Sequence, residues 1–189
     1  IFVASSSTQK RLPLNAGRYE FIEASNILEY RVKDIKSSIE FSNSYSNSSK
    51  IKQANKIIYT SRMTSKIRAV LVENQNLRYL GGKVNVIIPD TNGEIIVALL
   101  NSAVVNFWFK QKFGMTHMQG GALPINADEL KKIPIPLMNG PEYEKVKQLA
   151  SQVCITENNN AQTREELEQS ICDWYGINEA DREIVLRCL

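Results

Sequence analysis

The chain has 189 residues, of which 43% are hydrophobic and 23% are charged, a composition typical of a globular protein and not of a disordered one. This length predicts one domain, or one domain with an appendage. The apolar run from Ile95 is shorter than the roughly 20 residues that a bilayer requires, so we expect no membrane span and no membrane partner.

Charge is distributed unevenly along the chain. Residues 1–136 hold 18 Lys or Arg against 10 Asp or Glu, whereas residues 137–189 hold 5 against 10. Two parts of opposite net charge usually have different partners, and a positively charged part is compatible with nucleic-acid binding. The chain also starts at Ile1 in mid-pattern, and we expect it to be a piece of a larger protein.

The cysteines indicate a reducing compartment. Cys154, Cys172 and Cys188 are odd in number and widely spaced, which favours reduced thiols over a disulfide framework. We find no basic segment followed by an apolar run, the pattern of a secretory signal peptide. We therefore expect a cytoplasmic location.

Short strands dominate the predicted N-terminal part. Leu28–Lys33 alternates apolar and charged residues, the period of a strand with one wet face. Runs rich in β-branched residues begin at Lys56, Ile67 and Lys83. The Ser- and Asn-rich segment Ser42–Lys56 is too polar for a core and predicts a loop.

One long apolar helix follows a turn at Asn92-Gly93. From Ile95 the apolar residues recur at steps of three and four, which predicts a buried scaffold helix with a broad apolar face. A Gly-ended loop, Gly114–Gly121, then holds the only histidine. A short helical turn is expected to begin near Asn126 and to end at Pro134.

Three consecutive helices are predicted after Pro141. Thr163 is a plausible N-cap of the second, Gly176 ends it, and Asn178 caps the third. We expect the last two to form a helical hairpin. The predicted fold class is α+β, with a mixed, mostly antiparallel sheet lobe around one central buried helix, followed by a small C-terminal helical bundle or hairpin.

Several motifs of catalysis are absent from the sequence. It has no phosphate-binding glycine loop, no Gly-x-Ser-x-Gly nucleophile elbow and no Cys-x-x-Cys pair. The glycine loop and the Asn/Asp-Pro-Pro-aromatic tetrapeptide of adenine methyltransferases are also missing. A single histidine cannot build a His-rich metal site. We therefore predict that this chain alone is not an enzyme and holds no metal or cofactor.

The run Ala98–Pro136 resembles the TaqI-like C-terminal specificity domain of type II or IIG restriction-modification DNA methyltransferases. The shared features are a Leu-Asn-Ser at Leu100, an aromatic-rich helix, the Gly120-Gly121 pair and a Leu-x-x-Ile-Pro-Ile-Pro ending. Upstream, Lys56–Glu73 is similar to the strand, basic turn and strand that precede this helix. Downstream, Arg164–Leu186 is similar to the closing segment of these enzymes.

The resemblance implies a target recognition domain of a bacterial enzyme that binds double-stranded DNA and directs methylation to its site. It implies a recognition domain at residues 1–138 and a C-terminal helical segment at 139–189. The implied partner is a methyltransferase domain of the same polypeptide, with or without a fused nuclease. In such parents S-adenosylmethionine supplies the methyl group for adenine N6, and the target base is flipped out of the duplex.

Candidate DNA contacts lie in two segments, residues 50–68 and residues 110–121. No acid occurs between Glu40 and Glu73, and this stretch offers cations to phosphates and an Arg62 fork to guanine. The same pattern also fits a solvated loop, and the histidine also fits an ordinary surface position. Replacing both Arg62 and Arg68 with Ala should weaken duplex binding without unfolding the chain. The predicted DNA-binding residues are Lys50, Lys52, Lys56, Arg62, Lys66, Arg68, Lys110, Lys112, His117, Gln119, Gly120 and Gly121.

Two other functions remain open at the level of sequence. One is the specificity subunit of a type I restriction complex, which has a second recognition lobe and a much longer helix. The other is a protein-interaction domain without DNA binding, whose positive charge is incidental. Salt-dependent duplex binding separates DNA recognition from the latter, because phosphate contacts weaken steeply with added salt.

Overall fold

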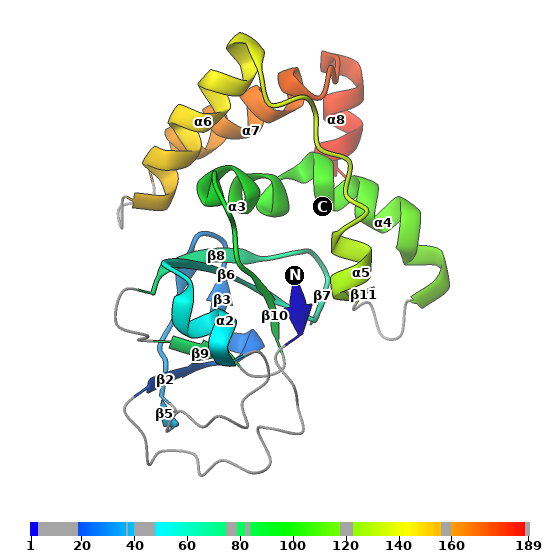
Figure 1. Cartoon of the computed structure of the whole chain (residues 1–189). Helices are drawn as coiled ribbons and strands as arrows, with labels where there is room; N and C mark the ends of the chain where they lie inside the picture. Colours follow the sequence, from blue (N-terminus) through cyan, green and yellow to red (C-terminus); the bar gives the residue numbers. More distant parts are fainter. Residues whose placement is uncertain are drawn as a thin grey trace.

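A four-stranded antiparallel sheet lies at the centre of the chain, in the order β1–β10–β6–β8 (Figure 1). The computed structural model describes residues 1–3, 19–36, 38–39, 48–74, 79–81, 84–117, 123–155 and 160–187. The three β-branched runs are confirmed as strands, each beginning at or shortly after the predicted residue. The strands are β1 (Phe2–Val3), β6 (Lys56–Ser61), β8 (Ala69–Glu73) and β10 (Val84–Ile87).

Both faces of this sheet are buried. Ile57 and Tyr59 of β6 enter one apolar cluster, whereas Ile58 between them enters another. The alternation follows from the period of two in a strand. The sheet therefore separates a lower layer, made by the N-terminal elements and α2, from an upper layer of helices (Figure 1).

The lower layer is a set of short elements around a second, mixed sheet. β2 pairs antiparallel with β5 and parallel with β9, so the mixed sheet that we predicted is present. A 3₁₀ turn, η1, and a small hairpin of β3 and β4 complete the layer. The bounds are β2 (Tyr19–Ile22), η1 (Ala24–Asn26), β3 (Ile27–Leu28), β4 (Arg31–Val32), β5 (Ser38–Ile39) and β9 (Tyr79–Gly81).

The prediction of a single strand over Leu28–Lys33 is wrong. The chain reverses at Glu29 and Tyr30, and Tyr30 adopts a positive φ of 64° that a strand residue does not take. The Tyr30 N–H donates to Ala69 O at 3.0 Å, so this reversal lies against β8.

The prediction of a loop over Ser42–Lys56 is wrong for the part that the structure describes. Helix α2 (Ser48–Gln53) forms there and buries Ile51 completely. The Asn74 amide donates to Ile51 O at 2.8 Å and to Ala54 O at 3.0 Å, which satisfies carbonyls at the helix end. Ile51 and Ala54 are both buried in the lower apolar cluster and place this polar segment on the core.

The long apolar helix is broken in two. Helix α3 (Gly93–Asn101) begins after Asn92, whose φ of 55° confirms the predicted turn, and helix α4 (Ala103–His117) begins after Ser102. The two helix axes are bent by 62°. The Ser102 hydroxyl donates to Leu99 O at 2.8 Å and accepts from Val105 N at 3.3 Å, so one residue ends α3 and caps α4.

The segment after α4 also differs from the prediction. α4 extends through His117, so the first part of the predicted loop Gly114–Gly121 is helical. Helix α5 (Ala127–Leu130) follows strand β11 (Leu123–Pro124) and confirms the predicted helical turn. Asn126 caps it, with a reciprocal bond from the Asn126 N–H to Glu129 at 3.1 Å.

Helices α6 (Gly140–Ile155), α7 (Ala161–Trp174) and α8 (Glu179–Arg187) cover α3 and α4 from above (Figure 1). α6 lies along α7 and on α3, whereas α8 packs on α4, so the predicted hairpin of the last two helices is wrong. The N-cap of α7 is Asn160 and not Thr163, while Asn178 caps α8 as predicted. Trp174 and Tyr175 hold the linker between α5 and α6, because Trp174 Nε1 donates to Leu137 O and the Tyr175 hydroxyl donates to Pro134 O.

The predicted α+β class is confirmed, with helices and small sheets in the expected order. Within the described ranges no single helix is long and apolar enough to cross a bilayer; only the bent pair Gly93–Asn101 and Ala103–Gly114 meets that test by length and composition.

Candidate nucleic-acid interface

The turn after β6 joins the sheet to the α4–α5 region. Arg62 follows the last residue of β6, and β7 (Met63–Thr64) then pairs antiparallel with β11. The Ile125 N–H donates to Arg62 O at 2.7 Å. The pairing therefore places Arg62 beside the strand that leads into α5. We call residues 62–68 the Arg62 turn.

Buried amide side chains anchor this turn from within the fold. Asn101 mimics a strand partner, because its Oδ1 accepts from Ala69 N at 2.8 Å and its Nδ2 donates to Ala69 O at 2.9 Å. Asn106 Oδ1 accepts from Ile67 N at 2.6 Å. Asn101 of α3 thereby holds Ala69, the residue directly after the turn, and Asn106 of α4 holds Ile67 within it.

A third amide anchors the start of the turn. Asn85 is fully buried in β10, and its Nδ2 donates to Thr60 Oγ1 at 3.2 Å and to Ile125 O at 2.9 Å. It thus ties β6 to the residue that bonds Arg62. Buried polar groups are almost always hydrogen-bonded, so isolated Asn residues within apolar runs were a signal of such anchors. Our sequence analysis used Asn101 only as part of the Leu-Asn-Ser motif and assigned no structural role to Asn106.

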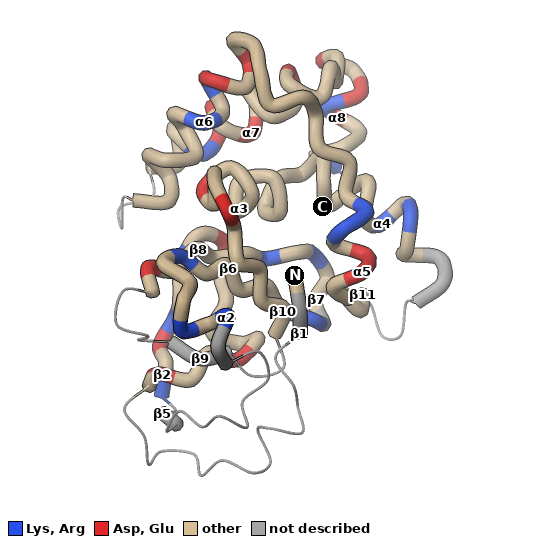
Figure 2. The backbone as a smooth tube through the Cα atoms, in the orientation of Figure 1, with Lys and Arg blue, Asp and Glu red and all other residues tan. Residues whose placement is uncertain are grey.

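Cationic residues of α4 and of the α5 end lie on the same side as β7. Figure 2 shows Lys and Arg positions gathered there, with the acids of α5 between them. Lys112 is exposed on α4, and Lys132 extends over the ring of Phe113 at 5.9 Å, which joins α5 to α4. Lys131 pairs with Asp128 at 2.8 Å. We call this set the basic edge; it comprises Arg62, Lys110, Lys112, Lys131 and Lys132.

Lys131 and Lys132 were missing from the sequence prediction. Their signal was a pair of lysines directly after a short helix, which we interpreted only as part of a helical turn. Nothing local indicated that α5 would lie beside α4 and β7. That neighbourhood follows from the pairing of β7 with β11.

Three more predicted lysines, Lys50, Lys52 and Lys56, lie at the other end of β6. Lys56 begins that strand, about 17 Å along it from Ser61 at the usual rise per residue. Its Nζ bonds Glu94 at 2.6 Å and lies 3.4 Å from Glu73. The hydrogen bond to Glu94 raises the pKa of Lys56. Lys56 is therefore part of an ion-pair group at the start of α3.

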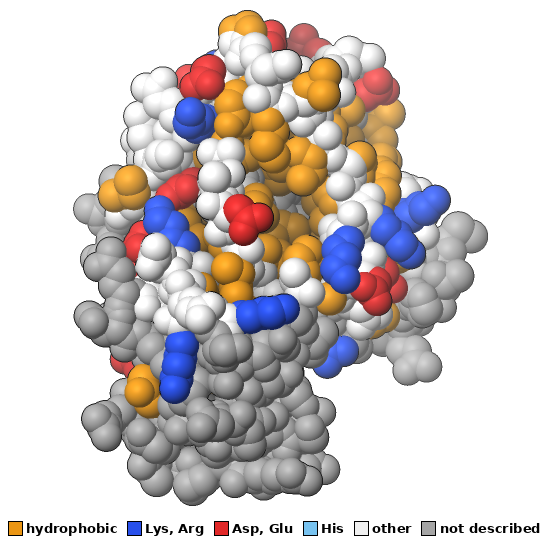
Figure 3. Space-filling model, in the orientation of Figure 1, with side chains coloured by type: hydrophobic (Ala, Val, Ile, Leu, Met, Phe, Trp, Pro, Cys, Tyr) orange, Lys and Arg blue, Asp and Glu red, His pale blue; other side chains and the backbone are white. Residues whose placement is uncertain are grey.

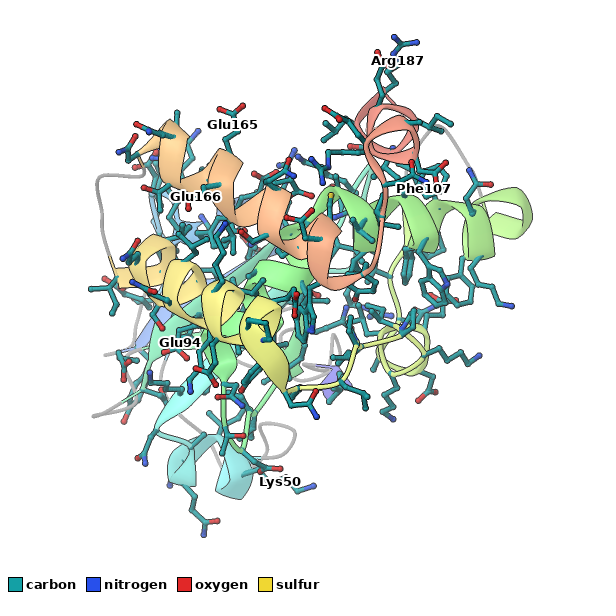
Figure 4. The ribbon with its side chains drawn as sticks, turned by 90° about the horizontal axis from the view of Figure 1, so that it is seen from above. Lys50, Glu94, Phe107, Glu165, Glu166 and Arg187 are labelled. Carbon is teal, nitrogen blue, oxygen red and sulfur yellow. The ribbon has the colours of Figure 1, made fainter. Side chains whose placement is uncertain are left out.

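Lys50 and Lys52 are exposed on α2. In the view from above, the labelled Lys50 lies far from Phe107 of α4 (Figure 4). The structure thus divides the predicted basic residues between the two ends of β6. A contact of either group with DNA stays a prediction.

The last predicted site residues have mixed outcomes. Lys66 is paired with Glu29, and Arg68 is half-buried. His117 is the final residue of α4, at the end of the helix and not within a loop. Gln119, Gly120 and Gly121 lie outside the described residues.

The family model of the TaqI-like C-terminal specificity domain matches residues 19–135, more than half of the chain. The chain therefore belongs to this family, and the predicted resemblance is confirmed. Such a domain has a DNA-recognition role in restriction-modification methyltransferases. The match includes the Arg62 turn and the basic edge but ends before α6, so the resemblance of Arg164–Leu186 lies outside it. No curated protein matches the chain.

Proposed function

We propose that this chain is the target recognition domain of an adenine-specific restriction-modification methyltransferase and that its basic edge contacts double-stranded DNA. Family membership supports DNA recognition. The adenine target and the cofactor S-adenosylmethionine come from the motif resemblance, and both belong to a methyltransferase domain of the same polypeptide. Such an enzyme acts in the cytoplasm, where its DNA is.

One observation carries the placement on this edge: β7 pairs with β11 and brings Arg62 onto the side that holds the α4 and α5 lysines. Lysines offer charge to phosphates, whereas an arginine can bond guanine through two parallel hydrogen bonds. In this arrangement Lys112, Lys131 and Lys132 position the duplex, and Arg62 reads a base.

The state of Arg62 supports its assignment as the reader. Arg62 is half-buried, and its Nε, like those of Arg164 and Arg182, is enclosed without a hydrogen-bond partner among the described residues. An enclosed polar atom without a partner carries a desolvation cost. An acceptor on DNA that draws the guanidinium outward removes this cost. Arg62 thus gains more from a base contact than a solvated surface arginine does.

The test is a fluorescence-anisotropy titration with a random-sequence duplex of about 30 base pairs at several salt concentrations. For the unmodified chain we expect log Kobs to fall linearly with log salt. Lys112→Met and Lys131→Met should each reduce the slope by about 0.9, because each removes one phosphate contact.

The matched control is Lys145→Met, an exposed lysine on α6 away from the basic edge. It should leave the slope unchanged. Binding that does not respond to salt favours the competing protein-interaction domain. An equal effect of all three substitutions contradicts the basic edge as the contact surface.

A further inference from the structure

Glu29 lies between two cations from opposite parts of the chain. Its carboxylate pairs with Lys66, which belongs to the Arg62 turn. Its other oxygen lies 3.9 Å from Arg164 Nη1 of α7. The side chains of Glu29, Lys66 and Arg164 are 27%, 29% and 32% exposed, so all three are mostly enclosed. An enclosed pair is screened less by solvent and salt than a surface pair.

Arg164 also holds the backbone of the β3–β4 reversal. Its Nη2 donates to Glu29 O at 3.2 Å, and its guanidinium lies 5.0 Å from the ring centroid of Tyr30. Tyr30 in turn donates from its N–H to Ala69 O at 3.0 Å. One arginine of α7 therefore fixes both the side chain and the main chain of the residue that pairs with Lys66.

The Arg62 turn is thus held on two sides. From within the fold, Asn106 bonds Ile67 N. From the C-terminal helices, Arg164 acts through Glu29 on Lys66. The ammonium of Lys66 is already committed to a carboxylate, which leaves Arg62 at the other end of the turn to meet a ligand.

We propose that Arg164, acting through Glu29, is a positioning residue for the Arg62 turn, and that Lys66 serves this positioning and does not contact phosphate. The proposal rests on the proposed function for the identity of the ligand. Arg164 lies outside the matched range of residues 19–135, so the C-terminal helices contribute to DNA recognition although they carry net negative charge.

The first test compares salt slopes with the same random-sequence duplex. Lys66→Met should weaken binding but keep the slope of the unmodified chain, whereas Lys112→Met lowers it by about 0.9. Lys66→Arg retains the pair with Glu29 and should restore the affinity. A slope lowered in Lys66→Met as in Lys112→Met makes Lys66 a phosphate contact and overturns the proposal.

The second test needs no DNA. Hydrogen exchange of the peptide covering residues 62–69 should be about threefold to fivefold faster in Arg164→Met, because loss of the bridge loosens the turn. Arg187→Met is the matched control. Like Arg164, Arg187 pairs with a glutamate, but that glutamate is Glu183 of the same helix, and Arg187 points outward on α8 (Figure 4). This variant should leave the exchange of this peptide unchanged.

A double variant separates positioning from general destabilisation. In a Glu29→Gln background, Arg164→Met should accelerate exchange by less than it does alone, because the carboxylate bridge is already lost and only the bond to Glu29 O and the Tyr30 contact remain to be removed. Additive effects, or unchanged exchange in Arg164→Met, overturn the proposal. A chain that does not bind DNA refutes the proposed function, while the exchange experiment still decides whether Arg164 positions the turn.

Discussion

At the scale of single residues, a carboxylate from α7 accepts a backbone N–H at the start of α4, just after the break from α3. The break at Ser102 leaves the first N–H groups of α4 without helical partners. Ala103 N donates to Glu168 Oε1 at 2.7 Å. Burial raises the pKa of Glu168, although the backbone hydrogen bond from Ala103 acts in the opposite direction. The ionised cap is therefore held at a cost.

This cost predicts a pH dependence for Glu168→Gln. Because the folded state raises the pKa above the ordinary 4.5, the folded protein loses stability as the pH rises through the folded pKa and the carboxyl ionises. Glutamine keeps an acceptor for Ala103 N and does not titrate. The unfolding free energy of the variant relative to the unmodified chain should therefore increase between about pH 4 and pH 7.

Urea denaturation at a series of pH values measures this difference. Glu165→Gln is a control on the same helix, since Glu165 is exposed and points away from the fold (Figure 4). It should show a much smaller trend. A difference that decreases with rising pH for Glu168→Gln contradicts the assignment of burial as the dominant cause.

At the scale of elements, the Asn101 side chain of α3 bonds the edge of β8 in the way that the backbone of a neighbouring strand would. Asn101 is 7% exposed and offers both an acceptor and a donor to Ala69. An apolar residue at this helix position cannot satisfy the edge of β8. The Asn-Ser step thus both secures the strand edge and turns the chain from α3 into α4.

Replacing Asn101 with Ala should lower the unfolding free energy by about 2–4 kcal/mol, because it leaves two buried backbone groups without partners. Denaturant titration measures the loss. Asn55→Ala serves as control, since Asn55 is exposed, and should change stability by less than about 0.5 kcal/mol. A loss for Asn101→Ala no larger than that of the control excludes the strand-like role.

At the scale of the whole molecule, the C-terminal helices share a core with the recognition part. Val146 of α6 and Ile171 of α7 are fully buried in the cluster that also contains Leu99 and Ala103. Figure 3 shows further apolar side chains at the surface between the helical layer and the sheet. Leu137, in the linker between α5 and α6, is 79% exposed.

This shared core predicts the behaviour of a fragment that ends at Met138. Its loss of α6, α7 and α8 uncovers the apolar faces of α3 and α4, so residues 1–138 should lack a cooperative thermal transition followed by circular dichroism. The complete chain should show one transition. A cooperative transition in the fragment would establish the predicted recognition domain as an independent folding unit.

Local pattern predicted much of the fold. The β-branched runs predicted β6, β8 and β10, and Asn92, Gly176 and Asn178 predicted turns and caps. It failed where one residue departs from its surroundings. Tyr30 takes a positive φ within an alternating strand pattern, and Ile51 buries a polar segment.

The sequence by itself determined the α+β class, the order of the elements and the family, because periodicity, capping residues and motif spacing are local properties. Only the tertiary structure decided which cations lie together. Lys56 and Arg62 are six residues apart but lie at opposite ends of β6, whereas β11 brings the distant α5 lysines to Arg62. Strand pairing joins segments far apart in the chain, and the local pattern of one segment does not identify the strand with which it pairs.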